Sequence, residues 1–218
     1  MLKKTLLVVG ILVAFPLSAS AGMLGSITSA VSGGSSSGGS NAVTAGNQLV
    51  AKYVAGNVSV LKAQRDMAKA LGLKTELAAD EATLKSMQSG SVSKHKLNKI
   101  DKIIATNSAA IKSQMASKPV LSAASKVEYA KGLGELAAGV IDYVGMKNAA
   151  AAFSSSASSL SPMAAAQDAS ELAAALYVAK SLPSSISNLG SALNEAVSFA
   201  KSNKIPVPAN ATKALGSL

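Results

Sequence analysis

The chain has 218 residues, no cysteine, one histidine and a formal net charge of +10. The missing cysteines exclude disulfides and thiolate metal sites, and the single histidine excludes zinc centres that use several histidines. One arginine among 21 basic residues, together with 3% aromatic residues, argues against nucleic acid as a partner, because arginine and aromatic rings supply most base and phosphate recognition.

The first 21 residues have the pattern of a cleavable secretory signal peptide. Lys3 and Lys4 precede an apolar run over residues 5–17, and residues 19–21 (Ala-Ser-Ala) are the small residues that signal peptidase recognises. The run is shorter than the about 20 apolar residues that span a bilayer. We expect cleavage before Gly22 and a periplasmic or secreted bacterial protein, whose charge falls from +10 to +8 with the loss of the two lysines.

Three further regions follow the signal peptide. Residues 22–46 are rich in glycine and serine and lack large apolar clusters, which predicts a flexible segment. Residues 47–204 have apolar side chains at helical spacing, which predicts the folded domain. We expect residues 205–218 to form a loosely held C-terminal tail.

The domain is predicted to contain five or six amphipathic helices. Their spacing places them at about 47–72, 75–90 and 93–117, from about 122 onward, at about 162–182, and at about 185–203. Residues 148–161 either extend the fourth helix or form a connection, and Pro183 is expected to end the fifth. No segment alternates like a strand, so we expect an all-α fold, an antiparallel helical bundle.

Each predicted helix has an apolar stripe for the core, and Asp66 is expected on the solvent side, where it could pair with Lys62. The residues expected to be buried in the later helices are Leu97, Ile100, Ile104, Ile111, Met115, Val127, Leu133, Leu136, Val140, Ile141, Val144, Leu172, Leu176, Ala179, Ile186, Leu189, Leu193, Val197 and Ala200. The fourth helix contains Gly132, Gly134, Gly139 and Gly145. These glycines predict either close approach of a neighbouring helix or a bend.

Catalytic motifs are weak in this sequence. The Gly-x-Ser-x-Gly match at 34–38 lies in the glycine-serine segment, and Ser-x-x-Lys occurs about as often as chance predicts, without its companion motifs. Glu128, Glu135 and Asp142 recur every seven residues on one helix face, which alone does not form the cleft of a two-carboxylate hydrolase. We therefore expect no enzymatic activity, no cofactor and no metal.

The most localised functional candidate is a run of cations in the third helix. We name the five residues Lys94, His95, Lys96, Lys99 and Lys102 the basic face. Asp101 is the only acid between Lys94 and Lys118. Like charges this close repel one another, so an anionic partner would stabilise the face; the alternative is an ordinary solvated helix surface.

The sequence favours an exported, soluble helical protein with a non-catalytic binding, scaffolding or chaperone-like role. Its partner would be a protein or an anionic component of the bacterial envelope. The alternative is a membrane-active or envelope-surface protein that binds anionic lipid or polymer through basic amphipathic helices. Charged residues interrupt the apolar stretch at 120–152, so we expect no transmembrane span after signal cleavage. The oligomeric state is left open.

Overall fold

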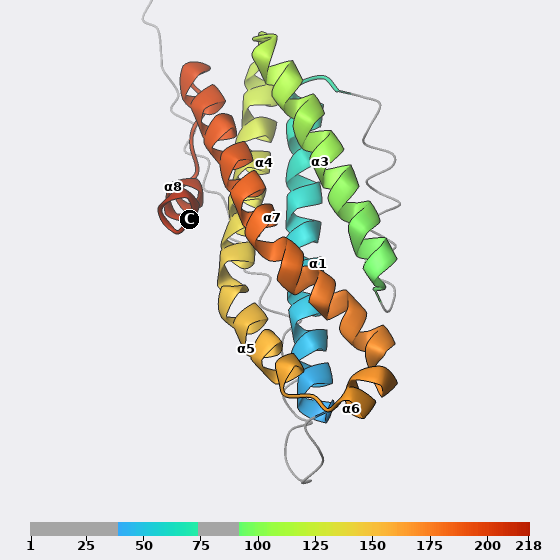
Figure 1. Ribbon diagram of the computed structural model, residues 1–218. Helices are drawn as coiled ribbons and strands as arrows, with labels where there is room; N and C mark the ends of the chain where they lie inside the picture. The colour runs from blue at the N-terminus through green and yellow to red at the C-terminus, as the bar shows by residue number, and fades with distance from the viewer. Residues whose placement is uncertain (1–38, 74–91) are drawn as a thin grey trace, which may run out of the picture. The chain divides into compact units, whose positions relative to one another are not determined.

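The computed structural model describes residues 39–73 and 92–218, and these residues are all-helical (Figure 1). The described helices are α1 (Gly39–Ala70), α3 (Lys94–Ala116), α4 (Ala123–Gly145), α5 (Lys147–Ser158), α6 (Pro162–Gln167), α7 (Ala169–Ser202) and α8 (Ala209–Gly216). The predicted all-α class is confirmed for these ranges. The predicted signal peptide and the helix expected at 75–90 lie outside them.

Local signals define several helix ends as predicted. Gly72 has a φ of +81°, the left-handed conformation with which glycine commonly ends a helix, and α1 stops two residues before it. Ser93 and Ser122 cap α3 and α4, each accepting a hydrogen bond from the backbone N–H three residues later. Of residues 148–161, left open above, 148–158 are helical and belong to α5, and 159–161 connect it to α6.

The core is centred on the contact between α1 and α4, the most extensive helix pair (Figure 1). A Cβ atom at Gly132 would lie 2.7 Å from Met67 Cγ and 2.9 Å from the Ala63 carbonyl oxygen. At Gly139 it would lie 2.8 Å from Val60 Cγ2. These distances are shorter than van der Waals contact, so both glycines allow close approach of α1 rather than bending α4.

The other helices pack around this pair. Helices α5 and α7 lie against α1, α8 lies against α4, and α3 contacts both α1 and α7 (Figure 1). The predicted buried stripe of α3 is confirmed in full, since Leu97, Ile100, Ile104, Ile111 and Met115 are all buried. Among the described residues, no helix is long and apolar enough to cross a membrane.

Three predicted boundaries are wrong. Helix α1 begins at Gly39 rather than near residue 47, because Ala42 packs fully into the core. Pro183 does not end a helix: it lies inside α7, which merges the two last predicted helices. The predicted loose tail contains α8, whose Ala211 and Ala214 are fully buried.

Three side chains also differ from their predicted environment. Val127 and Leu176 are exposed by 58% and 42%, because the helices around them leave those positions uncovered. Asp66 is buried rather than solvent-facing, and its carboxylate pairs with Lys131 of α4 at 2.8 Å and with Arg65 at 3.4 Å. A helical period locates one apolar stripe, but it does not show how many partner helices cover the rest of the surface.

Replacing Gly132 with alanine tests the close α1–α4 contact. Alanine improves helix propensity by about 1 kcal/mol, but the clash with α1 costs about 1–3 kcal/mol. We expect Gly132→Ala to lower the free energy of unfolding in urea by about 1 kcal/mol. Gly134→Ala is the matched control, because its Cβ would lie at 3.7 Å from Pro208 Cγ, an ordinary contact, and it should be neutral or stabilising. Equal stabilities of the two variants would contradict the packing argument.

Candidate functional site

The basic face lies along the N-terminal half of α3. Lys94, His95, Lys99 and Lys102 are exposed, and Lys96 is half-buried. The first turn of α3 contains no acidic residue. The positive end of the helix dipole is therefore surrounded by cations, which is an unfavourable arrangement for an isolated helix.

The acid within this run points away from the surface formed by the lysines. Asp101 Oδ2 accepts hydrogen bonds from the hydroxyls of Tyr53 on α1, at 2.8 Å, and Tyr177 on α7, at 2.6 Å. The Tyr53 hydroxyl also lies 3.4 Å from Ser185 Oγ. This cluster joins α1, α3 and α7 through a single carboxylate.

Burial controls the ionisation of these groups. It raises the pKa of the Asp101 carboxyl above its ordinary value of 3.8, and the hydrogen bonds from Tyr177 and Tyr53 offset part of the rise. Burial, aided by the charge and hydrogen bond of Asp101, raises the pKa of Tyr53 above 10.0 and that of Tyr177 to about 12. The tyrosines therefore remain hydrogen-bond donors well above neutral pH.

A second buried polar network links α1 to the next turns of α3. Gln64 Nε2 donates to the Ile104 carbonyl at 2.8 Å and to Ser108 Oγ at 2.9 Å, while Asn107 Nδ2 donates to Gln64 Oε1 at 3.3 Å. Nearby on α1, Asn57 Oδ1 accepts from the Tyr143 hydroxyl. These bonds satisfy polar groups that would otherwise be costly inside the core, whereas the buried Asn57 Nδ2 has no partner among the described residues.

A cavity of about 390 Å³ opens between α3 and α7 beside these networks. We name it the α3–α7 cleft. It is lined on α3 by Asp101, Ile104, Ala105 and Ser108, on α7 by Tyr177, Ser181, Ser184, Ser185, Asn188 and Leu189, and on α4 by Tyr143. Eight of these eleven residues carry a hydroxyl, amide or carboxylate group, set among apolar surface. The volume falls within the range of about 300–1,000 Å³ that is typical of small-molecule sites.

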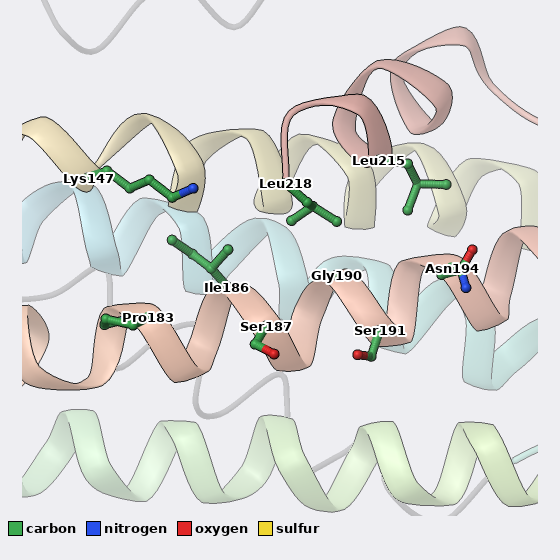
Figure 2. A pocket seen from close by; sticks show the side chains of 9 residues that line it. All are labelled: Lys147, Pro183, Ile186, Ser187, Gly190, Ser191, Asn194, Leu215 and Leu218. Carbon is green, nitrogen blue, oxygen red and sulfur yellow. The ribbon is translucent and has the colours of Figure 1, made fainter.

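A second cavity, of about 590 Å³, lies between α7, α8 and the start of α5 (Figure 2). Ile186 and Leu218 point into it, Leu215 borders it, and the Lys147 side chain reaches toward it from one end (Figure 2). Leu218 covers Gly190, where a Cβ would lie 2.7 Å from its Cδ1 atom. This cavity is wide, shallow and partly apolar, and no buried charge or hydrogen-bond network orients a ligand in it.

The acidic residues considered for catalysis are not brought together in one cleft. Glu128 pairs with Lys69 at 3.3 Å, and Asp142 is exposed, although partial burial raises the pKa of its carboxyl. Within the described ranges, no group of three or more histidine or acidic side chains could hold a metal ion. Sequence reasoning identified the basic face but missed the Asp101–tyrosine cluster, which joins residues 48 and 76 positions apart.

The tyrosines predict how stability changes at alkaline pH. All four tyrosines of the chain, at positions 53, 129, 143 and 177, have pKa values raised by burial. Their folded-state pKa values exceed the unfolded value of 10.0, so their contribution to stability is complete below pH 10 and is lost as pH rises toward about 12. We expect tyrosinate absorbance to appear together with loss of helical circular dichroism in this interval.

The urea-unfolded chain is the control for this titration, since its tyrosines should ionise near their ordinary pKa of 10. Because the absorbance reports tyrosinate alone, lysine deprotonation does not obscure it. Ionisation of all four tyrosines near pH 10 in a chain that keeps its helices would show that the hydroxyls are not buried as described.

No family model matches the chain, and no curated protein or solved structure matches it either. A functional proposal therefore depends on the residues and contacts of this chain.

Proposed function

We propose that the chain is an exported, non-catalytic binding protein of the bacterial envelope. In this proposal its helices form an antiparallel bundle that acts as a rigid scaffold, and the basic face of α3 docks an acidic protein or another anionic component of the envelope. The signal-peptide pattern of residues 1–21 supports export. The basic face supports an anionic partner.

One observation carries the binding proposal: Asp101, the one acid within the basic face, is hydrogen-bonded to tyrosines of neighbouring helices rather than paired with a lysine. Asp101 is held by Tyr53 and Tyr177, so it makes no ion pair with the lysines around it. Elsewhere in the described ranges, Lys69, Lys112 and Lys131 each have an acidic partner within 3.3 Å.

No described acid lies in an ion pair with Lys94, Lys99 or Lys102. Other exposed lysines are also unpaired, but these three stand close together in the N-terminal half of one helix. Their mutual repulsion and the unfavourable helix dipole both weaken when an anion binds. Binding an acidic surface would therefore lower the electrostatic free energy of this face, because no acid within the domain neutralises these lysines. If the face is only an ordinary solvated helix surface, an anionic partner should bind it no better than it binds other exposed lysines of the protein.

The export proposal predicts the mass of the mature protein. We expect the protein isolated from its native host to begin at Gly22 and to be found in the periplasm or the medium, because the peptidase recognises the Ala-Ser-Ala sequence before it. Intact-mass spectrometry of fractionated cells measures this directly. An uncleaved chain in the membrane fraction would contradict export by a cleavable signal.

A charge-reversal variant tests the docking face. We expect the triple variant Lys94→Glu, Lys99→Glu, Lys102→Glu to weaken binding to a polyglutamate peptide about 100-fold, because each lysine near an anionic surface contributes about 1 kcal/mol. Fluorescence titration at about 0.15 M salt measures the affinities, since the Debye length of about 8 Å then suppresses effects of distant charge.

The matched control reverses three exposed lysines outside the basic face: Lys180→Glu, Lys201→Glu and Lys213→Glu. Both triples change the net charge by the same amount and neither removes a described ion pair. We expect the control to lose less than about tenfold, through long-range charge alone. Equal losses in the two triples would show that net charge, rather than the α3 face, determines binding.

One observation favours the membrane-surface alternative as a second candidate. Val120, between α3 and α4, is fully exposed, and the exposed Val127 lies near it in sequence, with Lys118 and Lys126 beside them. Apolar side chains next to lysines are typical of segments that bind the surface of anionic membranes. Salt-sensitive binding to phosphatidylglycerol vesicles, lost in Val120→Ser, combined with no binding to polyglutamate, would favour this second function.

A further inference from the structure

The α3–α7 cleft has the features of a binding site separate from the basic face. One wall carries Asp101 and Ser108 at i and i+7 of α3, and the other carries Tyr177, Ser181 and Asn188 along one face of α7. Two rigid helices thus present polar groups to the same cavity of about 390 Å³. Side chains fixed on helices lose little freedom when a ligand binds.

The Asp101 carboxylate is oriented so that one of its oxygens remains available. Tyr53 and Tyr177 both donate to Oδ2, and no described group donates to Oδ1. Asp101 is half-buried, and Oδ1 is not among the fully buried, unpartnered side-chain atoms of the described residues, so it keeps some exposure to solvent. Because Asp101 lines the cleft, Oδ1 is an acceptor that a ligand can reach.

Further groups in the cleft supply donors and acceptors. Ser108 Oγ accepts from Gln64 Nε2 at 2.9 Å, so its own proton is free to be donated. The exposed Asn188 side chain has no described hydrogen bond and can both donate and accept. The Tyr177 and Tyr143 rings add apolar surface beside these polar groups.

The charges in and around the cleft select the class of ligand. The carboxylate repels anions, and no lysine, arginine or histidine of the described chain lines the cleft to bind one. Cations are disfavoured by the unpaired Lys99 and Lys102, which flank Asp101 in α3, and by the net charge of +8 expected for the mature chain. A neutral molecule with several hydroxyl groups avoids both repulsions and matches the acceptor, donor and amide positions.

We propose that the α3–α7 cleft binds a neutral saccharide, with a sugar hydroxyl donating to Asp101 Oδ1 and further hydroxyls pairing with Ser108 and Asn188. This site is independent of the proposed docking on the basic face. A single carboxylate and a half-open cleft place the affinity in the millimolar range, which is typical of small polar ligands with few buried contacts.

Three sugars of similar size but different charge test whether the cleft prefers a neutral ligand. Saturation-transfer NMR on the full mature chain compares glucose, which is neutral, with glucosamine, which is cationic, and glucuronate, which is anionic. We expect saturation transfer to glucose, and at least fivefold weaker binding of both charged analogues. Preference for glucosamine or glucuronate, or no binding of any of the three at millimolar concentration, would overturn the proposal.

Variants locate the bound sugar. We expect Asn188→Ala and Asp101→Asn each to weaken glucose binding at least fivefold, the second because it replaces an acceptor at Oδ1 with an amide donor while the other oxygen can still accept from the tyrosines. Asn188 is exposed and makes no described hydrogen bond, so its variant should fold normally.

Asn194→Ala is the matched control, because Asn194 is exposed on the same helix but lines the other cavity (Figure 2). It should bind glucose like the original chain. Loss of binding in Asn194→Ala together with normal binding in Asn188→Ala would place the sugar outside the α3–α7 cleft and would overturn the proposal. Because polyglutamate binding is measured separately, failure of either proposal leaves the other intact.

Discussion

Close contact between α1 and α4 is the constraint on which the rest of the structure depends. Gly132 and Gly139 bring the backbones together, and Gly56 on α1 accommodates the Tyr143 ring, to which a Cβ would approach within 2.9 Å. Small residues bury little apolar area themselves, but they allow larger neighbours to interdigitate at high density. In a chain without disulfides, this close packing must hold the two central helices together.

The same contact also positions the basic face and the α3–α7 cleft. Tyr143, seated on Gly56, packs against Tyr53 with ring centroids 5.1 Å apart. Tyr53 then directs its hydroxyl to Asp101 and fixes the first turns of α3 relative to α1. The orientation of α3 determines both which side chains border the cleft and which lysines face solvent. The basic face and the α3–α7 cleft are therefore two consequences of one packing arrangement.

Much of this fold could be predicted from the sequence, because helical periodicity and capping are local properties. The α3 stripe, the caps at Ser93 and Ser122 and the left-handed Gly72 all follow from a few neighbouring residues. Pro183 was misleading, since the packing of α7 against several helices outweighs one missing hydrogen bond. The Asp101 cluster could not be found, because its three residues lie on three different helices.

The polar interior is more informative about function than about stability. Removing a carboxylate from water is costly, and two tyrosine hydrogen bonds return only part of that cost, as the raised pKa of Asp101 indicates. A well-packed leucine at this position would join the three helices without any desolvation penalty. The carboxylate does two things that leucine cannot: it orients the hydroxyls of Tyr53 and Tyr177, and it presents Oδ1 to the cleft. If the proposed saccharide site is correct, recognition of a ligand accounts for this cost in stability, as it does at other binding sites.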